Sequence, residues 1–394
     1  MPITTESINQ VFKTVYLPMV SEQINVSLAA VAQKIESTTT DIETTGTVVK
    51  CVPYGLNGGT GSINENDPLP MSGSNKRENF RSELKTLAGT LEITDKAWKS
   101  SISNVAAFEN LLTSNMDGLK KSCQFSAGRQ YYGDGTGELT RCGTTTDSLT
   151  VEVASTQYLV EGMIVDLITN STGAEITNGS KRRIKSIDRA NKTITLEGTA
   201  TVTTASTVSV YEQGSKDKEM TGLGKVFAKV GSLYGLEKAS YSWLVPQLFE
   251  NVGTLTSRKF VTAMRQVRDY AGGNVDFIAT APAVYEEYYE YLETMQRQVN
   301  VVDLQGGFKS LSVNGIPLTS DRFIKDGEAH GLTSNEWKLH QLDDWNWMED
   351  DKGAIITLIK GYAKYTASLI KYAELICDHP GANFKMSGIT VTGG

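Results

Sequence analysis

A glycine-rich segment is the first part of this chain that could do chemistry. Residues 133–137 read Gly-Asp-Gly-Thr-Gly, which has the glycines of a phosphate-cradling loop. Such loops follow a strand and open a helix, so that backbone N–H groups point at the phosphate. Here the segment follows a helical pattern and precedes strand patterns. We therefore predict a turn in which glycine supplies positive φ.

Carboxylates gather in a second segment, where a catalytic acid/base pair could be imagined. The segment contains the glutamates Glu286, Glu287, Glu290 and Glu293 and the tyrosines Tyr285, Tyr288, Tyr289 and Tyr291. At helical spacing these residues divide between a solvated acidic face and an aromatic packing face. We predict that packing and solvation, not catalysis, explain them.

Histidines and cysteines complete the search for chemistry. His330, His340 and His379 form no His-x-x-x-His or Glu-x-x-His pair. The four cysteines form no Cys-x-x-Cys pair, so free thiols are expected. No Gly-x-Ser-x-Gly nucleophile motif occurs. We predict no catalytic residue, no cofactor and no metal site.

Composition describes a folded chain with room for two or three domains. The chain has 394 residues, of which 39% are hydrophobic, and a formal net charge of −7. This charge argues against a protein whose main task is to grip phosphate backbones. No apolar run approaches the roughly 18 residues of a membrane span, and the first residues do not resemble a signal peptide. We expect a chain that stays in the cytoplasm where it is made.

A long amphipathic helix must position the glycine turn. Between residues 104 and 130, apolar side chains recur every three or four residues, at Val105, Phe108, Leu112, Met116, Leu119 and Cys123. Gly118 and Gly128 each cost about 1 kcal/mol of helix propensity, so tertiary packing must hold the helix. Gly133 is its expected stop.

Two upstream segments look extended. Residues 1–45 read as an arm that lies on other surfaces. Residues 47–54 and 80–93 read as strands joined by a long Gly- and Pro-containing tip. Because an isolated hairpin is marginally stable, it should lie against a neighbouring subunit or against its own domain.

A threonine-rich stretch follows the helix. Five short alternating runs between 149 and 211 predict a small barrel or sandwich. Nucleic-acid binding by such a barrel needs aromatic platforms in a basic groove, whereas only Tyr158 and Tyr211 are present and acidic residues balance the basic ones. We interpret Lys181, Arg182 and Arg183 as a solvated strand edge.

Helices and strands alternate after the insertion. We predict helices over 249–270 and 283–298, with Pro282 in the first turn of the second, and a buried strand over 274–280 between them. Asn314-Gly315 predicts a tight hairpin. The C-terminal portion reads mostly as strand, ending in a long run over 362–377 whose β-branched and aromatic content favours strand. A helix over Ala363 to Leu375 is the alternative for this run.

The order of several short motifs resembles the major capsid proteins of tailed double-stranded DNA bacteriophages. The motifs are Ile93-Thr94-Asp95-Lys96, Asn110-Leu111-Leu112, the 131–137 junction, Gly222-Leu223, and the string from Val313 to Asp321. Each is weak alone, but their order downstream of an arm and a long loop makes the match specific. The resemblance covers most of the chain outside 141–215.

This resemblance implies an α+β fold with six parts. They are an N-terminal arm (1–45), an extended loop (46–93), a peripheral domain with a spine helix (94–140), an inserted β-barrel-like domain (141–215), an axial domain (216–340), and C-terminal strands that complete the peripheral domain (341–394).

The resemblance also implies a function. The chain would be a non-enzymatic head protein that self-assembles, as hexameric and pentameric capsomers, into an icosahedral or prolate shell around double-stranded DNA. It would be assembled in the host cytoplasm and reside in the virion. Further partners would be portal and decoration proteins, non-specifically bound DNA, and a separate scaffolding protein or none, because no charged prosegment precedes the arm. Some relatives cross-link subunits through a loop lysine; no sequence feature supports such a bond for Lys76 or Lys85.

Two groups of residues are the candidates for assembly contacts. Loop residues expected between subunits are Lys76, Arg77, Glu78, Phe80, Arg81, Glu83 and Leu84. Residues of the spine helix expected on an inner, DNA-facing surface are Lys120, Lys121 and Arg129. Apolar burial should outweigh exposed ion pairs in the loop contacts.

Two other functions remain open at this point. One is a nanocompartment shell of the encapsulin type, which resembles the same fold but encloses enzymes. The other is a soluble α/β enzyme with an accessory β domain.

Overall fold

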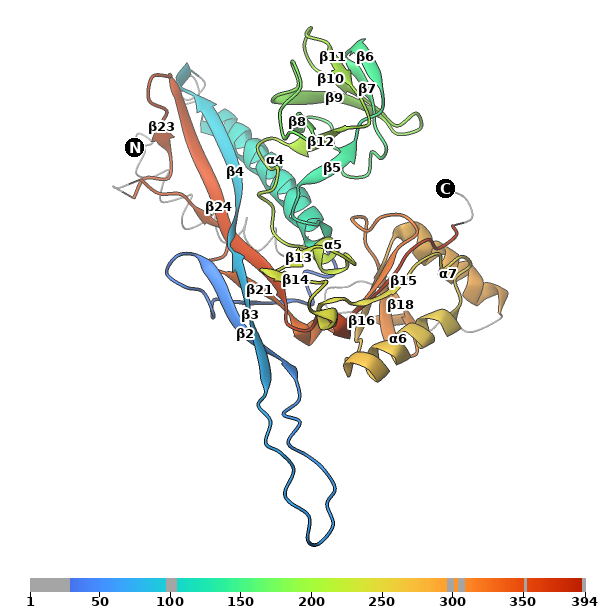
Figure 1. The fold of residues 1–394 in the computed structure, drawn as a ribbon. Coiled ribbons are helices and arrows are strands. Elements are labelled where there is room, and N and C mark those ends of the chain that lie inside the picture. Colours follow the sequence, from blue (N-terminus) through green and yellow to red (C-terminus); the bar gives the residue numbers. More distant parts are fainter. Residues whose placement is uncertain (1–28, 97–104, 296–300, 304–308, 351–352, 392–394) are drawn as a thin grey trace.

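The computed structural model describes residues 29–96, 105–295, 301–303, 309–350 and 353–391. Figure 1 shows four parts: a long sheet backed by a helix, a second sheet with two helices, a small β module, and a loop that projects away from the rest. Residues 1–28 of the predicted arm, Asn104 of the predicted spine helix and Gln298 of the predicted helix 283–298 lie outside the described residues.

The peripheral sheet is built on one long strand pair. β4 (Lys85–Thr94) runs antiparallel to β24 (Lys364–Cys377), with register from Lys364↔Thr94 to Ala373↔Lys85. The other strands of this sheet are β1 (Glu36–Thr38), β21 (Trp337–Gln341), β22 (Asn346–Trp347) and β23 (Thr357–Leu358). On β4, Leu87, Leu91 and Ile93 are buried in alternation, as one face of a strand requires.

The spine helix α4 (Val105–Tyr132) covers this buried face. Met116 and Cys123 are buried and Leu119 packs beside them. Gly89 of β4 lies directly beneath the helix, because an added Cβ would come within 2.6 Å of Cys123 Sγ. The predicted helix is confirmed, and its apolar stripe is buried over the second half, where side chains are described.

The axial sheet has seven strands in the order β15-β25-β20-β16-β19-β18-β17. Their bounds are β15 (Gln247–Phe249), β16 (Phe277–Thr280), β17 (Val301–Asp303), β18 (Lys309–Val313), β19 (Ile316–Ser320), β20 (Ala329–Leu332) and β25 (Phe384–Met386). Helices α6 (Ser257–Ala271) and α7 (Pro282–Thr294) pack together through Phe260 and Tyr288, whose rings meet edge to face with centroids 5.5 Å apart.

The β module between α4 and the axial part has a core of its own. Its buried residues include Val151, Val165, Leu167, Ile194 and Val210. The strands are β5 (Glu138–Arg141), β6 (Thr145–Ser148), β7 (Thr150–Glu152), β8 (Ile164–Thr169), β9 (Arg182–Asp188), β10 (Thr193–Leu196), β11 (Val202–Thr204) and β12 (Val208–Glu212). Six of them form a sheet in the order β5-β12-β8-β9-β10-β7.

Two sequence predictions about the chain's division need correction. The axial domain was predicted over 216–340, but β21 at its end joins the peripheral sheet. The C-terminal strands were predicted over 341–394 to complete the peripheral domain, but β25 pairs with β15 and β20 in the axial sheet. Strand pairing across the whole chain, which local pattern does not encode, decides both. The helix predicted from residue 249 begins at Ser257, because 247–249 forms β15.

The described end of the arm lies on its own subunit. Ala29 and Val31 are buried, and the Ala30 N–H donates to Asp321 Oδ2 at 2.9 Å. Tyr132, at the end of α4, donates its hydroxyl to the same oxygen at 2.9 Å. β1 then pairs in parallel with β21. One buried carboxylate therefore joins the arm, the spine helix and the axial part.

Candidate functional site: the extended loop and its root

The projecting loop consists of a hairpin and a bare tip. β2 (Thr47–Gly55) pairs antiparallel with β3 (Lys76–Glu83). Residues 56–75 beyond it form no strand, and Figure 1 shows them extending well past the rest of the molecule. Leu56, Leu69 and Met71 on this tip are 95%, 82% and 90% exposed. Three large apolar side chains on one short segment are thus left uncovered by their own subunit.

The root of the loop is clamped by aromatic rings. Phe80 of β3 is completely buried, with its ring centroid 5.1 Å from Tyr234 and 5.7 Å from Trp243. Tyr54 stacks on the other side of the cluster, 5.3 Å from Trp243. Tyr241 donates its hydroxyl to Glu78 Oε1 at 2.9 Å. These contacts tie the hairpin to residues 234–243 of its own subunit.

A buried carboxylate lies beneath the same root. Glu374 of β24 has no exposed surface and accepts a hydrogen bond from Ser82 Oγ at 2.8 Å. The backbone N–H of Thr221 donates to both carboxylate oxygens at 3.3 Å. Burial raises the pKa of Glu374 to about 7 even though these hydrogen bonds lower it. The carboxyl group therefore joins the loop, the peripheral sheet and the chain leaving the β module. Its one sequence signal is a glutamate inside an otherwise apolar strand.

The end of the spine helix holds a second charged cluster. Arg129 is buried and donates from Nη1 to Glu219 Oε2 at 2.8 Å, with a further short contact from Nη2 to Glu219 Oε1. Nη2 also lies 3.4 Å from Glu212 Oε2, which accepts from Ser126 Oγ at 2.8 Å. Burial alone would lower the pKa of Arg129, but the two glutamates hold it above its ordinary value. Arg129 stays charged and fastens α4 to the chain leaving the β module.

The glycine segment after the helix is a turn, as predicted. Gly135 and Gly137 have φ of 83° and 78°, in the region that favours glycine. The segment follows α4 and opens β5. Gly222 passes so close to the last turn of α4 that an added Cβ would lie 2.3 Å from the carbonyl oxygen of Gln130. No helix begins at the segment, so its amides do not form the helix N-terminus that holds phosphate.

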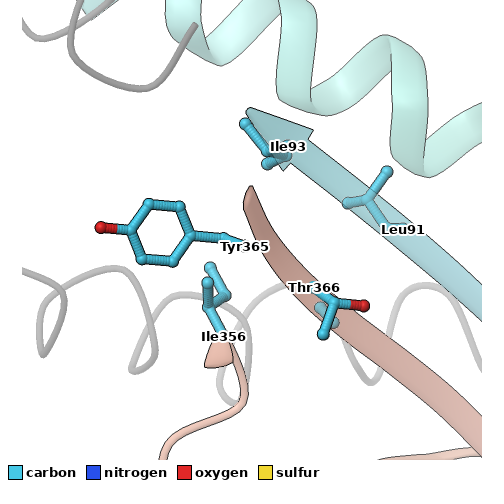
Figure 2. A pocket seen from close by; sticks show the side chains of 6 residues that line it. Leu91, Ile93, Ile356, Tyr365 and Thr366 are labelled. Carbon is cyan, nitrogen blue, oxygen red and sulfur yellow. The ribbon is translucent and has the colours of Figure 1, made fainter. Parts of the chain in front are cut away.

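Two hollows in the described part of the structure are the candidates for a ligand site. Figure 2 shows an apolar one, where Leu91, Ile93, Ile356 and Tyr365 meet near the end of the β4–β24 pair, with no room for a water molecule. The other is a cavity of about 130 Å³ between β4, α4 and the residues after β12. Ligand pockets measure about 300–1,000 Å³, so neither hollow suits a cofactor.

Comparison with known proteins turns on three-dimensional structure. No family model matches the sequence, and no curated protein matches it. A chain of the cyanophage A-1(L) capsid asymmetric unit is 12% identical and superposes with a TM-score of 0.51, over 90% of this chain and 93% of that one. The chain has a phage capsid fold. The predicted α+β capsid-protein fold class is thereby confirmed.

Two further solved structures superpose with lower TM-scores. The encapsulin of the holo-SrpI complex from Synechococcus elongatus PCC 7942 is 9% identical, with a TM-score of 0.46, and the match covers 91% of this chain and 86% of that one. A chain of the satellite phage P4 procapsid that includes the size determination (Sid) protein is 8% identical, with a TM-score of 0.45, over 95% and 99%.

Within this capsid fold, the predicted loop residues separate into three groups by exposure. Phe80 was expected between subunits, but its own subunit buries it fully, so this assignment is wrong. Glu78 and Leu84 are half-buried. Lys76, Arg77, Arg81 and Glu83 are exposed and form no ion pair within the described part of the chain. These four remain candidates for contact with a neighbour.

The predicted DNA-facing residues of the capsid fold also separate. Lys121 is exposed and Lys120 is half-buried. Arg129 is wrongly assigned, because Glu219 covers it and pairs with its positive charge, so that charge does not face DNA. Helical periodicity could not reveal this, since Glu219 lies ninety residues away, beyond the β module.

The remaining chemical candidates have structural partners in the capsid fold. The His330 ring lies 3.3 Å from Glu328 Oε2, and His340 Nδ1 lies 3.0 Å from the Thr40 carbonyl. Across the described ranges, no three His, Cys, Asp or Glu side chains come together as metal ligands would. On α7, Tyr288 is buried whereas Glu286, Glu290 and Glu293 are exposed, as predicted. Tyr289, predicted on the packing face, is 40% exposed, and Glu287, predicted on the acidic face, is half-buried, so this part of the prediction is wrong. None of the helices in the described residues is long and apolar enough to cross a membrane.

Proposed function

We propose that the chain is the major capsid protein of a tailed bacteriophage, which self-assembles into an icosahedral or prolate shell around double-stranded DNA. The observation that carries the proposal is the loop tip on a capsid fold. Leu56, Leu69 and Met71 are almost fully exposed on a segment that its own subunit leaves uncovered. A neighbouring subunit that received this tip would bury all three.

The driving force for this contact is apolar burial. Full burial of a side chain of this size contributes about 1.5–3 kcal/mol. Permanent assemblies bury about 2,000–5,000 Å² per interface, so the tip would be one part of a larger contact. The exposed charges Lys76, Arg77, Arg81 and Glu83 would add only about 0–1 kcal/mol for each pair. They would help to align neighbouring subunits in hexameric and pentameric capsomers.

DNA inside such a shell would be held weakly. The net charge of −7 suits a container whose wall does not bind its contents tightly. Lys120 and Lys121 are the proposed points of non-specific contact. The role is structural rather than enzymatic, its place is the virion, and assembly occurs in the host cytoplasm. Portal, decoration and scaffolding proteins are the proposed further partners.

Electron microscopy of the purified protein tests the proposal. We expect closed shells or capsomers without enzyme cargo. Small uniform shells that carry an enzyme would instead indicate a nanocompartment. A protein that remains monomeric at micromolar concentration and is stabilised by nucleotides would indicate the enzyme alternative.

Deletion of residues 56–72 is the sharper test. The root contacts of Phe80 and Tyr54 lie outside the deleted segment, so the subunit should fold with an unchanged circular dichroism spectrum. We expect it to form no stable shells. Normal particles from the deletion variant would contradict the proposed role of the tip.

A further inference from the structure

The exposed faces of α6 and α7 carry opposite charges at the same spacing. On α6, Arg258, Val261 and Arg265 are exposed at positions i, i+3 and i+7. On α7, Glu286, Tyr289 and Glu293 are exposed at the same three positions. Residues seven apart lie two turns along one helix face, about 10.5 Å from each other. Each face therefore carries two like charges, with Val261 between them on α6 and Tyr289 between them on α7.

Neighbouring residues strengthen the sign of each face. Arg268 adds a third exposed arginine on α6, and Glu290 adds a third exposed glutamate on α7. No lysine or arginine occurs within α7. On α6, Asp269 offsets part of the charge, since its carboxylate lies 3.8 Å from Arg265 Nε. The two stripes thus remain basic and acidic.

These charges do not neutralise each other within one subunit. The two helices touch through their buried sides, where the Ser257 and Tyr288 hydroxyls lie 3.1 Å apart and Phe260 packs on Tyr288. Both helices lie wholly within the described residues, and none of Arg258, Arg265 and Arg268 pairs with Glu286, Glu290 or Glu293. The local partner of Glu293 is the neutral hydroxyl of Tyr289.

The apolar residues between the charges are also uncovered. Val261 is 44% exposed and Tyr289 is 40% exposed. Both helices belong to the axial part and lie away from the β4–β24 sheet (Figure 1). Charges that flank an apolar contact steer association and exclude wrong alignments more than they add affinity.

We propose that the α6 stripe (Arg258, Val261, Arg265) of one subunit docks on the α7 stripe (Glu286, Tyr289, Glu293) of a second copy. The inference rests on the proposed shell function and specifies one contact that the shell uses. Equal spacing lets each arginine meet a glutamate while Val261 packs on the Tyr289 ring. A second copy is the fitting partner, because every subunit carries both the basic and the acidic stripe.

Charge reversal in separate subunits tests the contact. In R258E/R265E both stripes are acidic, and in E286R/E293R both are basic. Each variant alone should give at least about tenfold fewer assembled particles, since like charges then face each other. A one-to-one mixture of the two should assemble far better than either variant alone, because the α6 stripe of each variant is complementary to the α7 stripe of the other. A ring of six in which the variants alternate satisfies every such contact, whereas a ring of five leaves one like-charged contact. Particle yield would be measured by electron microscopy and sedimentation.

Matched controls place the same charge changes elsewhere. R183E/K185E and E161R/E175R alter exposed residues of the β module and should assemble as the wild type does. Circular dichroism and thermal unfolding would check that each subunit folds. If a reversal variant does not fold, R258Q/R265Q and E286Q/E293Q replace it. Each should assemble less well alone, and their mixture should recover in part, because the intact α6 stripe of E286Q/E293Q meets the intact α7 stripe of R258Q/R265Q.

Two results would overturn the docking contact: wild-type yields from either reversal variant alone, or no recovery in the mixture of folded variants. Failure of the proposed function looks different, because the wild-type chain itself would then form no shells. In that case, sedimentation of smaller oligomers still tests whether the α6 stripe docks on the α7 stripe of a second copy. Loss in each reversal variant and recovery in the mixture would support it, and unchanged oligomers would refute it.

Discussion

The root and the tip of the extended loop belong to one hairpin but differ in every physical respect. At the root, Phe80 is fully enclosed by rings of its own subunit, and Glu374 is buried beneath it. At the tip, Leu56 and Met71 are 95% and 90% exposed. The difference marks where packing within the subunit ends and where the proposed contact with a neighbouring subunit begins. The root fixes the direction of the loop before any partner arrives.

A fixed root has a consequence for assembly. A loop that already points in one direction loses less conformational freedom on docking than a free segment does. The contrast predicts that root substitutions change the stability of the subunit and that tip substitutions weaken only the assembly. Four changes test it, taken in order of their expected effect on the free energy of unfolding of the subunit.

Phe80→Ala should have the largest effect. Removing a buried phenylalanine costs about 3–5 kcal/mol, because the cavity left among Tyr234 and Trp243 cannot fully close. Chemical denaturation of the unassembled subunit measures the change. The tip variant Leu69→Ala is the control and should unfold as the wild type does. Equal stability of the two variants would show that the root contributes no more to subunit stability than the tip does.

Glu374→Gln should come next, with an effect that depends on pH. The folded-state pKa of about 7 lies above the ordinary value of 4.5, so the folded subunit holds a proton that the unfolded chain releases. This contribution is complete below pH 4.5 and is lost as the pH rises through 7. At about 1.4 kcal/mol per pKa unit, the loss amounts to about 3 kcal/mol.

Glutamine cannot ionise, so the variant should avoid this loss. We expect Glu374→Gln to be more stable than the wild type at pH 8 and similar to it at pH 5, as measured by denaturant unfolding at both pH values. Glu92→Gln, on the exposed face of the peripheral sheet, is the control. A stability difference that does not change with pH would show that Glu374 does not bind the proton.

The tip variant L56S/L69S/M71S should barely change subunit stability. Exposed side chains contribute within about 0.5 kcal/mol to the free energy of unfolding. Shell formation, by contrast, should fail, because the apolar contact with a neighbour is gone. Val160→Ser, at an exposed position of the β module, serves as the control for lost surface hydrophobicity. Intact shells from the triple variant would show that apolar burial of the tip does not drive assembly.

Lys76→Ala and Arg77→Ala should have the smallest effect. Both side chains are exposed, so subunit stability should not change, and assembly should weaken by about 0–1 kcal/mol for each. Assembly yields at low and high salt measure this, and the difference from wild type should shrink as salt rises. A loss above about 2 kcal/mol would indicate a buried ion pair at the interface instead.

Sequence patterns predicted the elements better than their partners. Alternation and helical spacing found β2, α4 and β24, because each of these has a regular buried face, and a continuous apolar run found the buried β16. The strand predicted over 80–93 was wrong, because it divides into β3, which pairs with β2, and β4, which pairs with β24. Phe80 was read as an interface residue because its partners, Tyr234 and Trp243, lie more than 150 positions away. Apolar pattern says that a side chain is buried, but not by which molecule.

The assigned roles of charged residues failed for a related reason. Arg129 continues the polar side of α4 and reads as a surface residue, yet Glu219 covers it after the chain has passed through the whole β module. Glu374 was overlooked because a single glutamate in a strand carries no spacing signal. In both cases the decisive partner is set by tertiary structure.

The two ends of the β module almost touch, since the Asp217 N–H donates to the Thr136 carbonyl at 2.8 Å. The chain therefore enters and leaves the module as it would a short turn, and the module's other contacts with the subunit are made by side chains, such as the Tyr158 hydroxyl, which donates to the Phe323 carbonyl at 2.7 Å. A foreign domain whose own termini lie close together can take the place of residues 138–216 without stretching the chain on either side. The turn at Gly133–Gly137 is in this sense a mounting point, at which a shell could present a chosen protein in many regularly spaced copies.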